Sequence, residues 1–295
     1  MNQDYIREPS AAPVVARNAS STRMTKAATA PWPGFFQPLW DLWHWRHVVH
    51  ALVEASEKST FNRMSLGIAW KYIEVFFFAF TYYFFVVILS HAEPSQGGHI
   101  LAVIMSGLMI FEWIRKSMLS SCNVLLSHQG LAITTNTPIA VIIVLGFYHN
   151  THASYPLWIS ALVVVGLVYG GFDYHILALP LILLVVGFCL FPVCVILAYL
   201  GAYFRDLGKV MEMVMRIALL LSPVMYEASR IPERLHIFLV LNPFATFIED
   251  ARAVMFSTSW PSLPPMLIAI AVSLVLWTCA LMMLQRIGRK VVKVL

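Results

Sequence analysis

Six apolar stretches, each about as long as a bilayer is thick, constrain the fold of this chain more than any other feature. A helix needs about 20 predominantly apolar residues to cross the hydrocarbon core of a membrane, where it satisfies its own backbone hydrogen bonds. The stretches cover roughly residues 68–89, 100–119, 139–169, 176–200, 210–225 and 266–284. Only 12% of the 295 residues are charged, about half the share in soluble proteins. The sequence therefore predicts an all-α integral membrane protein with six transmembrane helices.

The third span is predicted by joining two shorter apolar runs, residues 139–147 and 156–169. Each run alone is too short to cross a bilayer, and the polar residues 148–155 separate them. We interpret the whole stretch as one long helix whose polar part lies at the membrane interface or faces protein.

The residues before the first span divide into two parts. Residues 1–34 are rich in Ala, Ser, Thr, Pro and Arg, which is typical of a disordered tail, expected here in the cytoplasm. In residues 35–64, apolar side chains including Val49, Leu52 and Val53 fall on one broad helical face. This pattern predicts an amphipathic interface helix. Residues 65–295 are then expected to form the six-span domain.

The segment between the fifth and sixth spans predicts a re-entrant helical hairpin over about residues 227–256. Pro232 suits the first turn of a helix, and the dipeptide Asn242-Pro243 separates two helices. Phe244 and Phe247 then begin an apolar face, while Glu249, Asp250 and Arg252 occupy another face. The apolar part is too short to cross a bilayer. A surface loop with a packed helix is the alternative.

The basic residues orient the predicted spans. With the N- and C-termini in the cytoplasm, most of the 20 lysines and arginines lie inside. Only Arg230, Arg234 and Arg252 then lie outside, and Arg216 lies within the fifth span. This bias follows the positive-inside rule, so the hairpin is expected on the extracytoplasmic face.

Ionisable residues within the predicted spans are few, and such residues mark functional sites by default because they are costly in lipid. They are Glu74, Glu112 and Arg216. Glu74 and Glu112 fall near the predicted cytoplasmic ends of the first two spans. A structural ion-pair network with Lys71, Arg115 or Lys116 is the alternative to a role in gating.

Little in the sequence indicates an enzyme or a nucleic-acid binder. It has no GxxxxGK[ST] phosphate loop, so ATP hydrolysis would need a partner chain. Basic residues do not form a stripe with interleaved aromatic residues. His149 and His152 could share a helix face, but no third metal ligand is evident. The four cysteines lie in or beside apolar runs and are predicted to be buried.

Two expected cytoplasmic connections between spans are candidate contact sites for a partner protein. Residues 123–138 are long enough for a short helix parallel to the membrane, ended by Gly130 or by turn residues near Asn136. Residues 203–210 form a compact, charged connection.

Several short motifs, in this order and at these membrane positions, resemble one family. They are SLGIAWKYIE (65–74), HQGL (128–131), YFRD (203–206), SPVMY (222–226), IPERL (231–235) and LNPF (241–244). Over roughly residues 40–290 the chain resembles the ABC-2 type permeases that export capsular polysaccharide, O-antigen or teichoic acid across the bacterial inner membrane.

The resemblance implies a homodimeric channel with two separate ATPase subunits, which would hold ATP and Mg²⁺; no cofactor is expected in this chain. It places ATPase coupling at Ser127, His128, Gln129, Gly130, Arg205 and Asp206. Channel and substrate candidates are Phe77, Phe80, Tyr82, Phe84, Glu74, Glu112 and Arg216, because aromatic rings stack on the apolar faces of sugars. The hairpin residues Pro232, Asn242, Pro243, Phe244 and Phe247 would shape the outer mouth. The other expected partners are membrane lipid and periplasmic or outer-membrane export proteins.

The sequence departs from the capsule-type pattern at Val75, where those members usually carry Pro. The polymer is therefore left open between the capsule, O-antigen and teichoic acid branches. Two alternatives remain. One is a multi-span enzyme acting on lipid-linked sugars with His149 and His152 at its centre, and the other is an ABC-2 permease for a drug or small lipid.

Overall fold

A computed structural model describes residues 45–56, 66–67, 69–90, 97–134, 137–226, 243–256 and 259–286. Within these ranges every regular element is a helix, in agreement with the predicted all-α class. The predicted tail at residues 1–34 and the first half of the predicted hairpin, including Pro232 and Asn242, lie outside the described residues.

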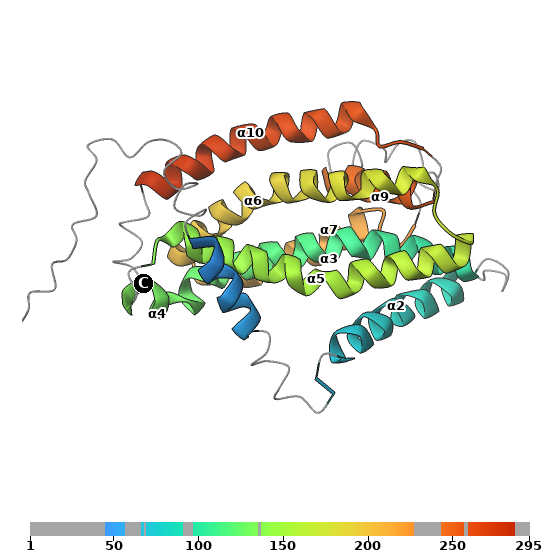
Figure 1. Ribbon diagram of the computed structural model, residues 1–295, viewed down its shortest axis with the longest axis horizontal. Helices are drawn as coiled ribbons and strands as arrows, with labels where there is room; N and C mark the ends of the chain where they lie inside the picture. Colours follow the sequence, from blue (N-terminus) through green and yellow to red (C-terminus); the bar gives the residue numbers. More distant parts are fainter. Residues whose placement is uncertain are drawn as a thin grey trace, which may run out of the picture. The chain divides into compact units, whose positions relative to one another are not determined.

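A helix over residues 45–56 precedes the other elements, most of which are labelled in Figure 1. These are α2 (Ala69–Ser90), α3 (Gly97–Ser127), α4 (Gln129–Thr134), α5 (Ile139–Tyr169), the 3-10 helix η2 (Tyr174–Ala178), α6 (Leu179–Tyr203), α7 (Leu207–Leu221), α9 (Pro243–Met255) and α10 (Leu263–Arg286).

Four helical segments in the described part of the chain are long and apolar enough to cross a membrane. They are Gly97–Ser127, Ile139–Tyr169, Tyr174–Tyr203 and Leu263–Gln285. Four of the six predicted spans are thus confirmed, as expected of a multi-pass membrane protein. Helix α2, with 22 residues, matches the first predicted span in its bounds. Helix α7, Leu207–Leu221, has 15 residues, about 22 Å at 1.5 Å per residue, and begins and ends three to four residues before the predicted fifth span.

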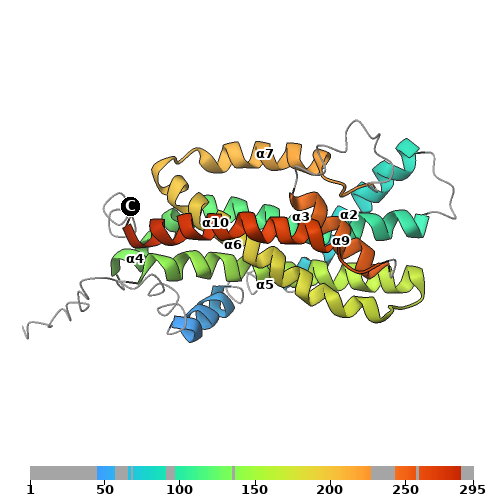
Figure 2. The same cartoon turned by 90° about the horizontal axis from the view of Figure 1, so that it is seen from above.

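Helix α3 forms the centre of the helical packing. It contacts α5 most extensively, then α6, and also α2, α7 and α9. Figure 2 shows α7 on one side of α3 and α5 on the other. Because it is surrounded, α3 is apolar almost all round: Ile104, Met105, Leu108, Met109, Ile110 and Phe111 are fully buried. It runs on to Ser127, well beyond the predicted end near Leu119.

Glycine allows α6 to approach α3 closely. A Cβ atom added at Gly201 would lie 1.8 Å from the carbonyl oxygen of Cys122 and 2.7 Å from its carbonyl carbon. Small residues permit such backbone approach between helices in membranes, where packing rather than the hydrophobic effect holds helices together. Gly201 therefore sets the distance between α3 and α6.

The third span is one continuous helix, as predicted. Its polar middle is satisfied within the helix itself: Asn150 Nδ2 donates to the carbonyl of Gly146 at 2.8 Å, and Ser154 Oγ donates to that of Asn150 at 2.8 Å. Asn150 and Ser154 are buried. Hydrogen bonds to the preceding turn thus let polar side chains face other helices.

The helix over residues 45–56 packs on α5. Val49 and Val53 are buried against Val141 and Leu145, whereas Leu52 is exposed. The predicted amphipathic character is therefore found, although its buried face is narrower than predicted and rests on protein.

Candidate functional site

The first candidate segment for ATPase coupling, residues 127–130, lies at the junction of α3 and α4. The break is at His128, whose N–H donates to the carbonyl of Val124 at 3.2 Å and whose carbonyl accepts from Leu131 at 3.0 Å. The Ser127 hydroxyl lies 3.0 Å from His128 Nδ1. Helix α4 then starts at Gln129. Gly130 lies inside α4, which ends at Thr134; of the two predicted ends, Gly130 is therefore wrong and the turn near Asn136 is close to the observed end.

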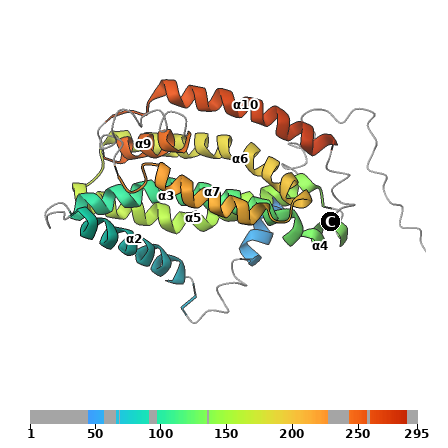
Figure 3. The same cartoon turned by 180° about the vertical axis from the view of Figure 1, so that it is seen from behind.

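The second coupling candidate, the turn between α6 and α7, lies beside the first. A Cβ atom at Gly208, in the first turn of α7, would lie 2.9 Å from the Asn123 side chain near the end of α3. A shared apolar cluster joins the surrounding helix ends; it includes Val124 and Leu125, Ile139, Tyr199 and Ala202, with Leu131 of α4 against it. Figure 3 shows α4 and the start of α7 at the same end of the bundle.

The residues at this end present polar and aromatic groups outward. Ser127, Gln129, Gly130, Arg205 and Asp206 are exposed, and so are the rings of Tyr203 and Phe204. Asp206 and Lys209 form an ion pair at 3.7 Å, with both side chains largely exposed. We call this group of residues the coupling end. The fold thus brings together two segments that lie more than 70 residues apart in the sequence.

Helix α2 carries an exposed aromatic face. Phe77, Phe80 and Phe84 are each more than half exposed, at 69%, 62% and 57%, and the rings of Phe80 and Phe84 stack at 6.2 Å. Glu74 is exposed on the same helix; the side chain of Tyr82 lies outside the described part. Between α2, α3 and α5, Phe76, Phe80, Tyr83, Leu101 and Val164 are among the residues that line a cavity of about 320 Å³.

The other ionisable candidates form ion pairs within their own helices. Arg115 Nε and Nη2 donate to the two carboxylate oxygens of Glu112 at 2.8 and 2.7 Å. Glu112 is buried and lies midway along α3, not near its end as predicted. On α7, Arg216 donates to Glu212 at 2.6 Å, and both side chains are exposed. The bidentate geometry at Glu112 satisfies a buried carboxylate in the way that planar arginine favours.

Helix α9, the described half of the predicted hairpin, is buried on most of its surface. Phe247, Ile248, Ala251, Val254 and Met255 belong to the main apolar core, and Phe244 packs against it. Asp250 and Arg252, predicted on a face other than the apolar one, are both buried, so that face is not exposed to water. Helix α9 contacts α3, α6, η2 and α10.

Asp250 joins α9 to the start of α10. Its Oδ1 atom accepts from the backbone N–H of Ser262 at 2.9 Å and from the Ser262 hydroxyl at 2.6 Å. Burial raises the pKa of Asp250, and these hydrogen bonds lower it by a smaller amount. The two hydrogen bonds therefore cap the beginning of the last span.

Arg252 joins α9 to α3 and to the turn after α7. Its Nη2 atom donates to the carbonyls of Val103, Pro223 and Val224 at 3.0, 2.9 and 3.3 Å. Its Nη1 atom donates to the Tyr226 carbonyl at 3.2 Å and to Glu249 at 2.7 Å, and Nε lies 3.4 Å from Ser106 Oγ. We call this arrangement the Arg252 clamp. The sequence indicated no such role, because its acceptors are mostly backbone atoms of distant residues.

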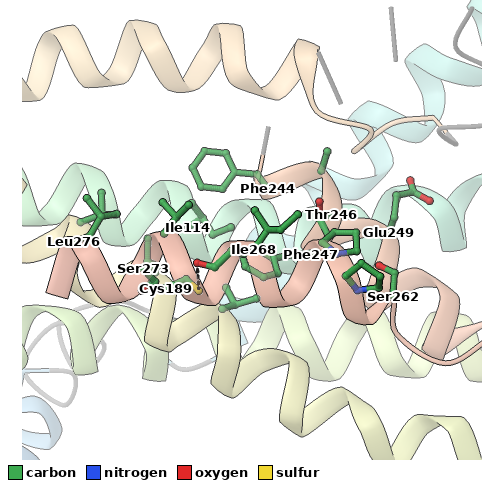
Figure 4. Close-up of a pocket in the computed structure, with 18 of the residues that line it drawn as sticks. Ile114, Cys189, Phe244, Thr246, Phe247, Glu249, Ser262, Ile268, Ser273 and Leu276 are labelled. Carbon is green, nitrogen blue, oxygen red and sulfur yellow. Dashed lines mark hydrogen bonds between the residues drawn. The ribbon is translucent and has the colours of Figure 1, made fainter. Parts of the chain in front are cut away.

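An apolar cavity of about 740 Å³ lies between α3, α6, α9 and α10. Figure 4 shows side chains from all four helices around it, among them Ile114 of α3, Cys189 of α6 and Ile268 of α10. Its few polar lining groups include Thr246, Glu249 and Ser262 at one end. The thiol of Cys189 donates across it to the carbonyl of Ala269 at 3.7 Å.

The histidine pair offers no metal centre in the described part of the chain, where no three His, Cys, Asp or Glu side chains gather. The ring of His152 instead lies between those of Tyr148 and Tyr155, at 6.4 and 5.1 Å. All four cysteines are free; Cys122 and Cys194 are buried as predicted, but Cys279 is exposed.

Two known proteins are similar to this chain over most of its length. One is an O-antigen export system permease protein, RfbA, of Myxococcus xanthus, 23% identical over 243 residues, which are 80% of this chain and 90% of that protein. The other is the protein of the same name from Klebsiella pneumoniae, 24% identical over 198 residues, or 66% of this chain and 74% of that protein. No protein-family model matches the chain. The resemblance to ABC-2 type polysaccharide export permeases, predicted from the motifs, is confirmed by the similarity to these two O-antigen export permeases.

Proposed function

We propose that this chain is the membrane permease subunit of an ATP-driven exporter that moves a cell-surface polysaccharide, of the O-antigen or capsular kind, across the bacterial inner membrane. The observation that carries the proposal is the similarity to O-antigen export permeases over 80% of the chain. The polymer is expected to be linked to a lipid.

The coupling end is the proposed docking surface for the ATPase subunits. Energy must enter from a partner, because the sequence has no P-loop. A rigid surface transmits force best when its parts are packed together, and the cluster around Val124, Leu131 and Tyr199 joins α4 to the ends of α3, α5 and α6. Gln129 and Arg205 are exposed on this surface.

The exposed face of α7 is the proposed contact with a second copy of the chain. This face carries Val210, Met213, Val214, Ile217 and Leu220. Apolar exposure alone suits lipid equally well. The same helix, however, exposes the Glu212–Arg216 pair, and a charged pair is costly against hydrocarbon. A protein interface or a water-filled path lowers that cost, so α7 is expected to face the dimer interface.

The aromatic face of α2 is the proposed surface along which the polymer moves. Phe77, Phe80 and Phe84 are exposed in a row along the helix. Aromatic faces bind sugar rings without requiring one ionisation state, which suits a long polymer that must slide. Glu74 lies on the same helix and is a candidate for contact with sugar hydroxyls.

Copurification tests the proposal most directly. The tagged chain, extracted from a strain that carries its chromosomal neighbours, is expected to bring down a P-loop ATPase whose ATP hydrolysis depends on the permease. Deleting the gene should abolish surface polysaccharide. A chain that purifies without an ATPase from a strain with normal polysaccharide export would contradict the proposal.

A charge in the docking surface tests the coupling assignment. Gln129→Asp should insert normally but lower export by about tenfold, the effect of losing roughly 1.4 kcal/mol of binding to the ATPase. Arg46→Asp, on an exposed position of the first helix, is the matched control for insertion. Replacing His149 and His152 together by Ala should leave export intact; loss of polymer synthesis in that variant would support the enzyme alternative instead.

A further inference from the structure

The Arg252 clamp joins three segments that are far apart in the sequence. Its acceptors are the Val103 carbonyl and the Ser106 hydroxyl of α3, the carbonyls of Pro223, Val224 and Tyr226 after α7, and the carboxylate of Glu249 on α9. The Arg252 side chain is only 4% exposed. A buried guanidinium is kept charged, so each of its hydrogen bonds is charge-assisted and strong.

The turn held by the clamp is the SPVMY motif, residues 222–226. Its backbone is tight, because the N–H of Val224 donates to the carbonyl of Ser222 at 2.7 Å. Ser222 and Val224 are fully buried. The motif therefore presents carbonyl oxygens to Arg252 rather than side chains to a ligand.

Gly107 is a second, independent observation that α3 and the turn at residues 222–226 approach each other closely. A Cβ atom there would lie 2.5 Å from the Val224 carbonyl oxygen, 2.9 Å from Val224 Cα and 3.0 Å from Arg252 Nη2. Any larger residue would displace the turn from α3. The absence of a side chain at position 107 thus leaves the room that the clamp needs.

Helix α7 connects this clamp to the other end of the bundle. It begins at Leu207, directly after the Arg205 and Asp206 turn of the coupling end, and it ends at Leu221, directly before the clamped turn. Most of α7 is exposed, and Met215 is its one buried residue. An α-helix keeps its length through its own backbone hydrogen bonds, so displacement of the start of α7 also moves the clamped turn at its end.

We propose that Arg252 is a positioning residue that couples α7 to α9, so that displacement at the coupling end reaches the buried helix α9. This inference rests on the proposed function, because it assumes that an ATPase acts at the coupling end. It assigns to α9 a movement driven through the Ser222–Tyr226 turn.

The experiment uses the full permease–ATPase complex in liposomes, with hydrogen–deuterium exchange of backbone amides measured with and without ATP and vanadate. In the wild type, nucleotide should change exchange both at residues 222–226 and in α9. In Arg252→Met, the change at residues 222–226 should persist while the change in α9 is lost. Polymer exported per ATP should fall by about fivefold or more, the lower range of measured coupling effects.

Three further variants separate coupling from folding. Arg252→Lys keeps the charge but loses the planar fork that reaches several acceptors, so partial coupling is expected. Gly107→Ala keeps Arg252 and displaces the turn, so it should lose the same α9 response even where Arg252→Met fails to insert. Arg46→Met, an exposed arginine of the first helix, should behave as the wild type.

Two results have distinct meanings. A wild-type complex without ATP-dependent export refutes the proposed function. A wild-type complex that exports, together with an Arg252→Met variant that keeps both the α9 response and the wild-type export per ATP, refutes the coupling role of Arg252.

Discussion

Replacing Gly201 by Ala should separate α6 from α3 and destabilise the protein. The new Cβ atom would lie 1.8 Å from the carbonyl oxygen of Cys122, whereas ordinary contact begins at 3.4 Å. The backbones must therefore move apart by the difference, 3.4 − 1.8, or about 1.6 Å. A gap of even 0.5–1 Å forfeits a quarter to a half of the dispersion energy of the atoms beside it.

The magnitude follows from two opposing effects. Overpacking of this kind costs about 3 kcal/mol, at the upper end of the usual range because the obstructing atoms are backbone. Alanine regains about 1 kcal/mol of helix propensity over glycine. The net loss of about 2 kcal/mol corresponds to a fall in Tm of roughly 4–8 °C.

The assay is thermal unfolding of the purified protein in detergent, followed by intrinsic fluorescence. Gly98→Ala is the matched control, because a Cβ atom at Gly98 would meet only Val168 side-chain atoms at 3.5 and 3.6 Å, which is ordinary contact. That variant should match or exceed the wild-type Tm. Equal Tm values for the two variants would refute the reasoning that backbone approach at Gly201 fixes the helix spacing.

Three further outcomes are expected. Asp250→Asn should raise Tm at neutral pH. Burial raises the pKa of the Asp250 carboxyl above its ordinary value of 3.8. The stability contributed by the protonated carboxyl is therefore fully present below pH 3.8 and is lost as pH rises through the raised pKa. The Tm difference between this variant and the wild type should grow as pH rises from 3.8 through the raised pKa and then level off; a difference that is constant from pH 3.8 to neutral pH would contradict it. Val53→Asp should release the first helix from α5, because it places a charge in a buried cluster, and proteolysis near residue 56 should increase; unchanged cleavage would show that the helix does not rest there. Glu112→Leu should cost less stability than the roughly 3–5 kcal/mol of a fully buried broken pair, because the Arg115 side chain is 33% exposed and the pair is not fully buried; a Tm loss well above the one expected for Gly201→Ala would contradict this.

Hydropathy predicted the most apolar helices well and missed the features that depend on tertiary contacts. The predicted spans 176–200 and 266–284 lie within a few residues of α6 and α10, because no charged residue interrupts those runs. The prediction ended the second span near Leu119, with Glu112, Arg115 and Lys116 toward that end. In the structure Glu112 pairs with Arg115, and Ser121 Oγ donates to the Ser117 carbonyl at 2.6 Å.

The two segments of the candidate site were predictable from the sequence, but their proximity was not. Local sequence indicated that residues 123–138 and 203–210 connect spans, but their proximity depends on the close contact at Gly201. Arg252 was predicted on the polar face of an amphipathic segment, because a hydropathy pattern assigns charged side chains to the face that meets water. Its main acceptors are carbonyls of residues such as Val103, nearly 150 positions earlier, and a carbonyl has no signature in the sequence.

The length of the central helices has a consequence for where a partner can reach the protein. Helices α3 and α5 each have 31 residues, so each is about 46 Å long at 1.5 Å per residue. A hydrocarbon core is about 30 Å thick, and a typical tilt of about 20° shortens the projected length by only a few ångströms. The ends of these two helices therefore extend beyond the acyl chains into the headgroup layer. A soluble protein can contact these helix ends without displacing lipid.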